Sequence, residues 1–154
     1  MKMKNLLVAT AMAAVCASLP AYAATDAECQ AEWTRADTNK DGTISNTEAA
    51  RYAAALRVHD KEIANGTLDQ ATFLKYCRDD VFAMRKNDDN APLKGANSFT
   101  EGQAKDRAIA QGFMSIDSLK KDGDGIWRGS AMQDGKAVQV AIDYKGNVVP
   151  QASQ

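Results

Sequence analysis

The feature that most constrains this chain is the twelve-residue stretch 37–48, DTNKDGTISNTE, in which oxygen-bearing side chains recur at a fixed spacing. Asp37, Asn39 and Asp41 occupy positions 1, 3 and 5, and Glu48 occupies position 12. Gly42 at position 6 permits the positive φ that a sharp turn favours. A stretch of this kind either surrounds a hard cation with oxygen ligands or forms a glycine-containing Asx turn that binds nothing.

The stretch resembles the calcium-binding loop of the EF-hand family at every diagnostic position. The resemblance implies one bound Ca²⁺ that is the only cofactor of the protein. In that family Glu48 would contribute both carboxylate oxygens, Thr43 its backbone carbonyl and Ser45 a bridging water. The metal ligands implied in this way are Asp37, Asn39, Asp41, Thr43, Ser45 and Glu48.

Residues 61–72 form a second, decayed loop of the same kind, because Gly66 aligns with Gly42 and Leu68 with Ile44. Cationic, apolar and hydroxyl side chains stand where the family has its first, second and last side-chain ligands, and they cannot hold calcium in that geometry. These are Lys61, Ile63 and Thr72. We therefore expect residues 25–84 to be an all-α EF-hand pair with one competent and one empty loop, joined by a short bridge between Ile44 and Leu68.

The helices of this pair are predicted from capping and periodicity. Thr25 and Glu28 form a capping box that starts a helix over 26–36, and Ser45 and Glu48 form a second box before a helix that ends near Val58. A further helix is expected over 70–84. Trp33 is assigned to the core and not to a ligand-stacking role.

The first 23 residues have the features of a bacterial Sec signal peptide. Lys2 and Lys4 precede an apolar run over 6–17, and Ala21-Tyr22-Ala23 is a cleavage motif. The run is too short for a membrane span. A lipoprotein reading would use Cys16, but Val15 fits the lipobox poorly. We expect a periplasmic or secreted protein, residues 24–154, with no membrane span.

Two cysteines remain after cleavage, Cys29 and Cys77. An even count in an oxidising compartment suggests one disulfide, and the outer helices of an EF-hand pair would bring the two together. The alternative is two buried free thiols. The mature chain has 17 basic and 20 acidic residues, a net charge of −3, and no basic cluster that would suggest nucleic acid.

The C-terminal half follows a polar linker over 85–97. Ser98 and Glu101 form a capping box for a helix to about Gln111, which Gly112 ends. A strand is predicted over 113–119. Residues 122–125, DGDG, resemble a third calcium loop, but neither register supplies the ligands, so a hairpin turn is favoured.

Asp134-Gly135 predicts a two-residue hairpin turn between strands over 126–133 and 136–144. With that turn, Val138 faces Ala131, Val140 faces Gly129 and Ile142 faces Trp127. The alternation buries one face, which the preceding helix should cover, and Val148-Val149 is expected to add a last strand.

Residues 98–150 resemble the PepSY family in the order helix, strand, hairpin and in three stretches: GIWR at 125–128, MQDGK at 132–136 and VAIDYKGNV at 140–148. That family is associated with protease propeptides and extracytoplasmic protein contacts. The resemblance implies no catalytic residue in this chain. Together the two halves make the expected fold class α+β, with the PepSY-like α+β unit over 98–154.

We expect a non-catalytic calcium-binding protein that contacts another periplasmic protein. The alternative is a PepSY-like protease inhibitor or chaperone in which the EF-hand pair of residues 24–84 is structural support. An enzyme is disfavoured, because the mature chain has one histidine and no nucleophile elbow, zinc motif or phosphate-binding loop.

Cleavage after Ala23 is tested by mass spectrometry of the exported protein. The measured mass should correspond to a chain that begins at Ala24. An intact Met1, or a lipid on Cys16, would contradict the signal-peptide assignment.

Overall fold

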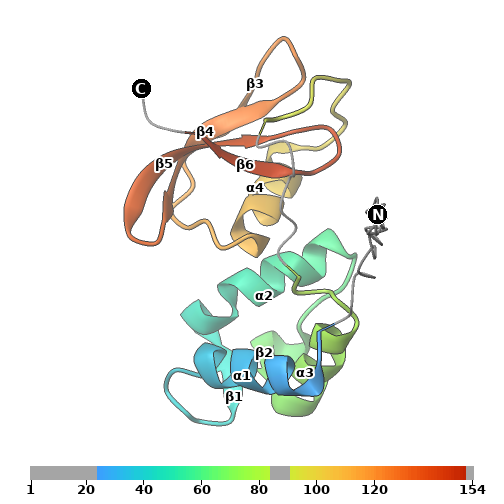
Figure 1. Cartoon of the computed structure of the whole chain (residues 1–154), viewed down its shortest axis with the longest axis vertical. Coiled ribbons are helices and arrows are strands. Elements are labelled where there is room, and N and C mark those ends of the chain that lie inside the picture. Colours follow the sequence, from blue (N-terminus) through green and yellow to red (C-terminus); the bar gives the residue numbers. More distant parts are fainter. Residues whose placement is uncertain (1–23, 84–90, 152–154) are drawn as a thin grey trace, which may run out of the picture.

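The computed structural model describes residues 24–83 and 91–151, and it is α+β as expected. A helical unit precedes a unit of one helix and a four-stranded sheet (Figure 1). The helices are α1 (Asp26–Ala36), α2 (Asn46–Val58), α3 (Gln70–Arg78) and α4 (Glu101–Ala110), with a 3₁₀ turn over Ala64–Gly66. The strands are β1 (Thr43–Ser45), β2 (Thr67–Asp69), β3 (Lys120–Lys121), β4 (Trp127–Gln133), β5 (Lys136–Ile142) and β6 (Val148–Gln151). The predicted signal peptide lies outside the described residues, in which no helix is long and apolar enough to cross a membrane.

The two loops of the helical unit are joined as predicted. Strands β1 and β2 pair antiparallel, with Ile44 opposite Leu68, and both side chains are buried. Behind this bridge lies an aromatic core centred on Phe73, whose ring lies 5.4 Å from Trp33 and 5.0 Å from Tyr52 between centroids. Trp33 is therefore a core residue, as expected, and edge-to-face packing of these rings adds to the free energy of burial.

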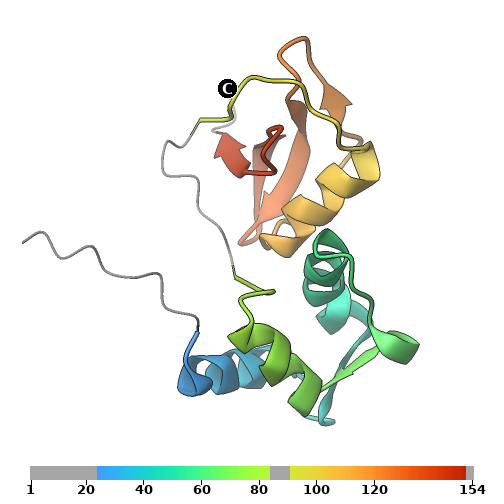
Figure 2. The same ribbon diagram turned by 90° about the vertical axis from the view of Figure 1, so that its right-hand side faces the viewer.

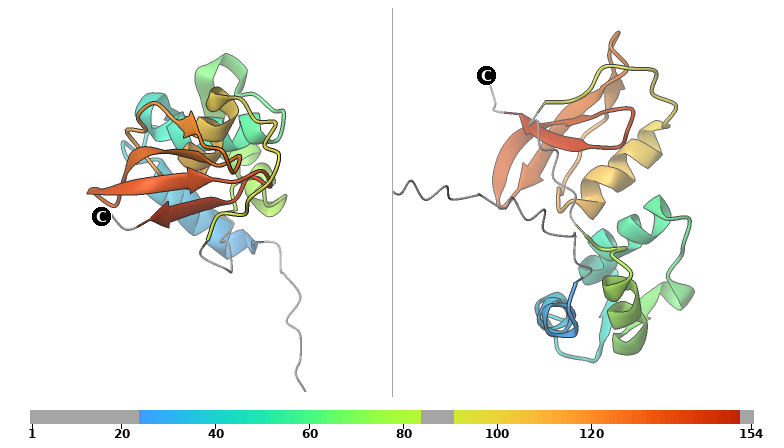
Figure 3. Two further views of the ribbon diagram at one scale, coloured as in Figure 1. Left: turned by 90° about the horizontal axis from the view of Figure 1, so that it is seen from above. Right: turned by 45° about the vertical axis from the view of Figure 1, so that its right-hand side comes forward.

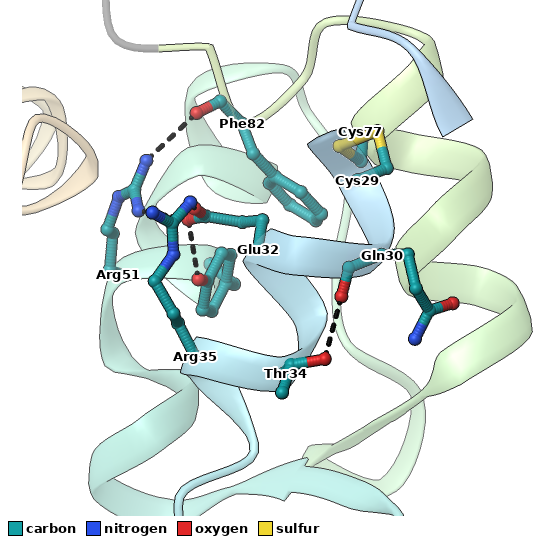
Figure 4. Close-up of polar contacts among 9 residues, drawn as sticks. Cys29, Gln30, Glu32, Thr34, Arg35, Arg51, Cys77 and Phe82 are labelled. Carbon is teal, nitrogen blue, oxygen red and sulfur yellow. Dashed lines mark hydrogen bonds and ion pairs between the residues drawn. A yellow bond between two sulfur atoms is a disulfide. The ribbon is translucent and has the colours of Figure 1, made fainter. Parts of the chain in front are cut away.

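Cys29 of α1 and Cys77 of α3 form a disulfide, with 5.7 Å between their Cα atoms (Figure 4). Both residues are buried in the core of the helical unit. The bridge closes a long loop, 48 residues in sequence separation, that contains both predicted calcium loops. In the chain-entropy model such a crosslink stabilises the fold by about 4 kcal/mol.

Helix α3 ends at Arg78, so the predicted helix over 70–84 is too long. Asp80 adopts a left-handed conformation, φ 56°, and the Val81 amide donates to the Tyr76 carbonyl at 3.0 Å. This is the Schellman arrangement, which usually places glycine at the left-handed position. Val81 and Phe82 then turn into the core. Met84, at the end of the predicted helix, lies outside the described residues.

Two of the three predicted capping boxes are wrong. Helix α4 starts from Thr100, whose side chain pairs with Gln103, and not from Ser98. Glu101 is then free to accept the Leu119 amide at 3.1 Å, which ties the helix to the chain before β3. Ser45 makes no side-chain cap on α2, and the Glu48 carboxylate accepts the Asn39 amide of the preceding loop. The box of Thr25 and Glu28 is confirmed.

The sheet has the order β3-β4-β5-β6, all antiparallel. The predicted register is confirmed, with Ala131 opposite Val138, Gly129 opposite Val140 and Trp127 opposite Ile142. The predicted strand over 113–119 is wrong: Met114 makes a single bridge to Met132, and pairing resumes only at β3. The turn over 122–125 joins β3 to β4, as expected. Helix α4 covers one face of the sheet through Ala104 and Ala108 (Figure 2).

The described part of the predicted linker, residues 91–97, lies against the sheet unit (Figure 3). The Leu93 amide donates to Asp143, a carboxylate with no exposed surface, at 3.1 Å. Asp143 also accepts from the amides of Lys145 and Asn147 and from the Asn147 side chain. One buried carboxylate thus shapes the turn after β5 and attaches this segment to it. Gly95 lies so close to the β3–β4 turn that a Cβ on Gly125 would fall 1.9 Å from its carbonyl oxygen.

Helix α2 is buried on two sides, which the sequence did not indicate. Tyr52 and Leu56 belong to the core of the helical unit, while α4 packs across the helix from the other unit (Figure 1). Ala54 and Ala55 are buried in α2, and Ala110 of α4 belongs to the core of the helical unit. Small side chains on both helices allow their backbones to approach closely. Arg57 of α2 and Asp106 of α4 form an ion pair with nitrogen–oxygen distances of 2.6 to 3.0 Å at the edge of this contact.

The guanidinium of Arg51 joins three segments around this contact (Figure 4). It donates to Glu32 of α1 at 2.7 Å, to the Phe82 carbonyl at 3.1 Å and to the Ala110 carbonyl of α4 at 3.2 Å. The Tyr52 hydroxyl also donates to Glu32, at 2.9 Å. Burial raises the pKa of Glu32, but the hydrogen bonds from Tyr52 and Arg51 outweigh it, so the net pKa is lowered. Burial and the charge of Glu32 raise the pKa of Tyr52.

Removal of Arg51 should be costly, because two backbone carbonyls lose a donor at once and Glu32 loses one of its three. We expect Arg51→Ala to lower the free energy of unfolding by about 2 to 3 kcal/mol, measured by urea titration. Arg35→Ala is the matched control, since Arg35 also pairs with Glu32 at 2.6 Å but its side chain is 73% exposed. That variant should lose less than about 0.5 kcal/mol. Equal losses would show that Arg51 acts only as a surface charge.

Candidate calcium site

The stretch 37–48 runs from the end of α1 through β1 into the first turn of α2. Asp37 caps the C-terminus of α1, where its amide donates to the Trp33 carbonyl at 2.9 Å. Gly42 has φ +82° and open space around its Cα, so this glycine is required by the backbone conformation and not by crowding. Beyond it, the bridge of Ile44 with Leu68 fixes the second half of the loop against the core.

The first three predicted ligands lie together and share backbone donors. Asp37 accepts the amides of Asp41 at 3.2 Å and Gly42 at 3.1 Å, and its side chain is buried. Asn39 accepts the Asp41 amide at 3.0 Å and donates its side-chain amide to Asp41 at 2.9 Å. These contacts hold the turn with its oxygen atoms gathered on one side of the backbone.

Asp41 and Glu48 are held by hydroxyl and amide groups of the loop. One Asp41 oxygen accepts from both the amide and the hydroxyl of Thr43, each at 2.8 Å. The Oε1 atom of Glu48 accepts the amides of Thr38 and Asn39 at 3.0 and 3.1 Å and the Thr38 hydroxyl. The Thr38 hydroxyl is the main reason that the pKa of Glu48 is lowered, and the Thr43 hydroxyl does the same for Asp41.

The second carboxylate oxygen of Glu48, Oε2, differs from the other carboxylate oxygens of the loop in its hydrogen bonding. Oε2 is buried and has no hydrogen-bond partner within the described residues. Burial of an acceptor without a donor is unfavourable, and more so when the acceptor is ionised. Glu48 is also the residue from which the loop would take two ligand oxygens. An unpaired oxygen at this position fits a cation that is bound there.

The three carboxylates among the predicted ligands, Asp37, Asp41 and Glu48, do not meet at one point. Across the described residues, no group of three or more His, Cys, Asp and Glu side chains is arranged to hold a metal ion. Ser45 lies in β1 and its hydroxyl accepts from the side chain of Asn46 at 3.3 Å. A closed shell would require Asp41 and Glu48 to exchange the hydroxyl groups of Thr43 and Thr38 for the ion.

In the second loop, the residues that replace the calcium ligands make contacts within the protein. Thr72 donates its hydroxyl to Asp69, the N-cap of α3, at 2.9 Å. Ile63 packs against the core, and the Lys61 ammonium lies 5.8 Å from the centroid of the Tyr76 ring. The DGDG turn is likewise engaged by its own contacts, since Asp122 accepts from the Ile126 amide and from Arg128, at 2.9 and 2.7 Å.

The sequence reasoning missed Thr38, because the second position of such a loop supplies no ligand and carries no recognised preference. Its role is visible only once the loop folds and brings Thr38 to Glu48, ten residues further on. The Arg51 contacts were missed for the same reason. Their partners come from α1, α4 and the segment after α3, and no local pattern predicts that arrangement.

A scan with protein-family models, a search of the curated proteins and a search of the solved structures each found no match to this chain.

Protonation of Asp41 and Glu48 at low pH should destabilise the calcium-free protein. Folding lowers the pKa of Asp41 and Glu48, so their contribution to stability is present above their usual values near 4 and is lost as the pH falls through the lowered values. The free energy of unfolding, measured in calcium-free urea titrations, should therefore fall between pH 6 and pH 3. Glu48→Gln should reduce that fall, whereas Glu62→Gln, at an exposed position of the second loop, should leave it unchanged. A full acid response in Glu48→Gln would contradict this account.

Proposed function

We propose that the protein binds one calcium ion through residues 37–48 and has no catalytic activity of its own. The observation that carries the proposal is the buried Oε2 of Glu48, which has no partner in the described chain although Oε1 of the same carboxylate accepts three hydrogen bonds. A divalent cation would supply the missing partner and use both oxygens of Glu48.

The chemistry of the donor set fits calcium. Carboxylate, amide and backbone carbonyl oxygens are hard ligands, and calcium accepts six to eight of them in a flexible shell. The residues that would hold the ion are Asp37, Asn39, Asp41, Thr43, Ser45 and Glu48. The bound ion would neutralise part of the charge of three carboxylates and would connect the end of α1 to the start of α2.

Affinity should be modest, on the order of 10⁻⁵ to 10⁻³ M, in the range of extracellular modules and weak sensors. The hydrogen bonds of Thr38 and Thr43 must be given up before the shell can close, and the second loop has no ligands with which to reinforce the first. With one site, cooperative switching of the kind seen in paired competent loops is not expected. The role is structural support or a graded response to millimolar calcium.

The expected compartment is extracytoplasmic, and the disulfide supports this proposal. Disulfides persist in oxidising compartments and are uncommon in the reducing cytosol. The Cys29–Cys77 bridge holds α1, which leads into the loop, against α3, which follows the second loop. It would keep the loops in register whether or not the ion is present.

Calorimetric titration with calcium tests the proposal. The purified, disulfide-intact protein should bind one ion, and Glu48→Gln should weaken binding at least tenfold, since it removes a charge and the bidentate grip. Thr72→Ala, at the same position of the second loop, is the matched control and should bind like the parent. Calcium at a hundred times its dissociation constant should add about 2.7 kcal/mol to the free energy of unfolding.

Three results would count against this function. A stoichiometry of two would mean that the second loop also binds. Unchanged affinity in Glu48→Gln would place the ion elsewhere. Absence of binding at 10 mM calcium would leave the loop as an Asx turn without a ligand.

A further inference from the structure

A cavity of about 250 Å³ lies where the helical unit meets the sheet unit. Its walls come from four places: the end of α2, the segment after α3, the end of α4 and the turn between β5 and β6. Figure 1 shows the last turns of α4 against α2, the contact beside which the cavity lies. Apolar side chains such as Val58 and Val81 form part of the wall, and Arg107 is half-buried there, whereas His59 and Lys145 are exposed at its edge.

The ionisable side chains that line this cavity are all basic. They are Arg107 from α4, Lys145 from the β5–β6 turn and His59 from the end of α2, and no Asp or Glu of the described chain lines it. Two carboxylates act on Arg107 from outside, Asp106 and Asp60. Asp106 is already held by Arg57 through both of its oxygens. The cavity therefore carries an excess of positive charge at neutral pH.

Arg107 is held rigidly but has few hydrogen-bond partners. Its guanidinium lies 3.7 Å from the centroid of the Phe99 ring, and one Nη1 hydrogen bond runs to the Gln103 carbonyl at 3.1 Å. Gly146 makes room for it, because a Cβ there would lie 2.8 Å from Nε of Arg107. No other acceptor for its N–H groups is found in the described residues, and burial lowers its pKa. A guanidinium has five N–H donors in a planar fork, so most of them are available.

We propose that this cavity binds a small oxyanion, a carboxylate or phosphate group, on the guanidinium of Arg107. The planar fork of arginine matches two oxygen atoms of such a group, and charge-assisted hydrogen bonds of this kind are stronger than neutral ones. Lys145 supplies a second positive charge, and His59 and Gln111 add side-chain N–H donors. A volume of about 250 Å³ lies below the range of drug-sized ligand sites, which restricts the ligand to a small metabolite or the end of a chain.

The proposed ligand would touch both units of the protein, since His59 belongs to the helical unit and the other cationic groups to the sheet unit. It would therefore reinforce the contact between α2 and α4. This site shares no residue with the calcium loop and does not depend on calcium binding, so either proposal can fail without the other.

Titration of the purified, disulfide-intact protein with inorganic phosphate, and separately with succinate, tests the proposal. Amide chemical shifts followed by NMR should move saturably at residues that line the cavity. The buffer should be stripped of metals by resin, because phosphate precipitates calcium and polycarboxylate chelators would compete for the site. Saturation by one anion and not the other identifies the class of ligand, and saturation by both supports the shared oxyanion chemistry.

Three variants and one control assign the binding to the cavity. Arg107→Gln should weaken binding at least tenfold, and Lys145→Gln about twofold to fivefold. Asp60→Asn, which removes a competing carboxylate, should strengthen binding. Lys120→Gln changes an exposed lysine of β3 and should have no effect.

If Arg107→Gln fails to fold, Lys145→Gln and Asp60→Asn still test the proposal, because both residues are exposed and their replacement should not disturb folding. No saturable shift with either anion up to 50 mM overturns the proposal. Equal weakening by Lys120→Gln and Lys145→Gln also overturns it, since the shifts would then report non-specific attraction of anions to surface lysines.

Discussion

One guanidinium group links three segments at the contact between the two units, beside the packing of α2 on α4 and the Arg57–Asp106 ion pair. Arg51 lies on α2, the helix that both units share, and its donors reach α1, the segment after α3 and the C-terminal turn of α4. Two of the three acceptors are backbone carbonyls, and that of Ala110 is the last of α4, where such groups lack intrahelical partners. Arginine suits this role because its planar fork can satisfy several acceptors at once, whereas a lysine at the same place would act as a point charge.

The rest of the arrangement follows from the small side chains of α2. Tyr52 and Leu56 turn to the aromatic core, and Ala54 and Ala55 are also buried, so the helix keeps only part of its surface for solvent. Helix α4 also presents small buried side chains. Ala104 and Ala108 belong to the core of the sheet unit, and Ala110 belongs to the core of the helical unit. The alanine-rich composition that makes each core thin thus allows the two cores to share helices, and the protein is best described as two units with a common wall.

Local patterns predicted the parts of the fold that are decided locally. The hairpin register followed from Asp134-Gly135 because a two-residue turn leaves one pairing. Gly112 marked the end of α4, since glycine adopts the left-handed conformation at little cost. Helices α2 and α3 end in the same way on Asp60 and Asp80, and aspartate carries a weaker signal. The helix predicted over 70–84 therefore extends beyond the observed end of α3 at Arg78.

The candidate site shows a similar division. The spacing from Asp37 to Glu48 was read from the sequence, and the structure adds what the spacing cannot contain: the grip of Thr38 on one oxygen of Glu48 and the isolation of the other. The predicted capping box failed at Ser45, whose side chain makes no hydrogen bond to the start of α2. The Glu48 carboxylate instead accepts amides from Thr38 and Asn39, which the local pattern does not reveal.

Asp143 connects the segment that follows the helical unit to the turn after β5. Its carboxylate holds the amide of Leu93, near the start of the described chain after the helical unit, and also shapes the turn that carries Lys145 and Gly146. The same segment is also held by Gly95, whose amide donates to the Asp124 carbonyl, and by Asn97, whose carbonyl accepts from Lys121. A ligand bound in the cavity would therefore contact a turn that residues 91–97 help to hold, so the segment that follows the helical unit and the wall of the cavity share one buried support.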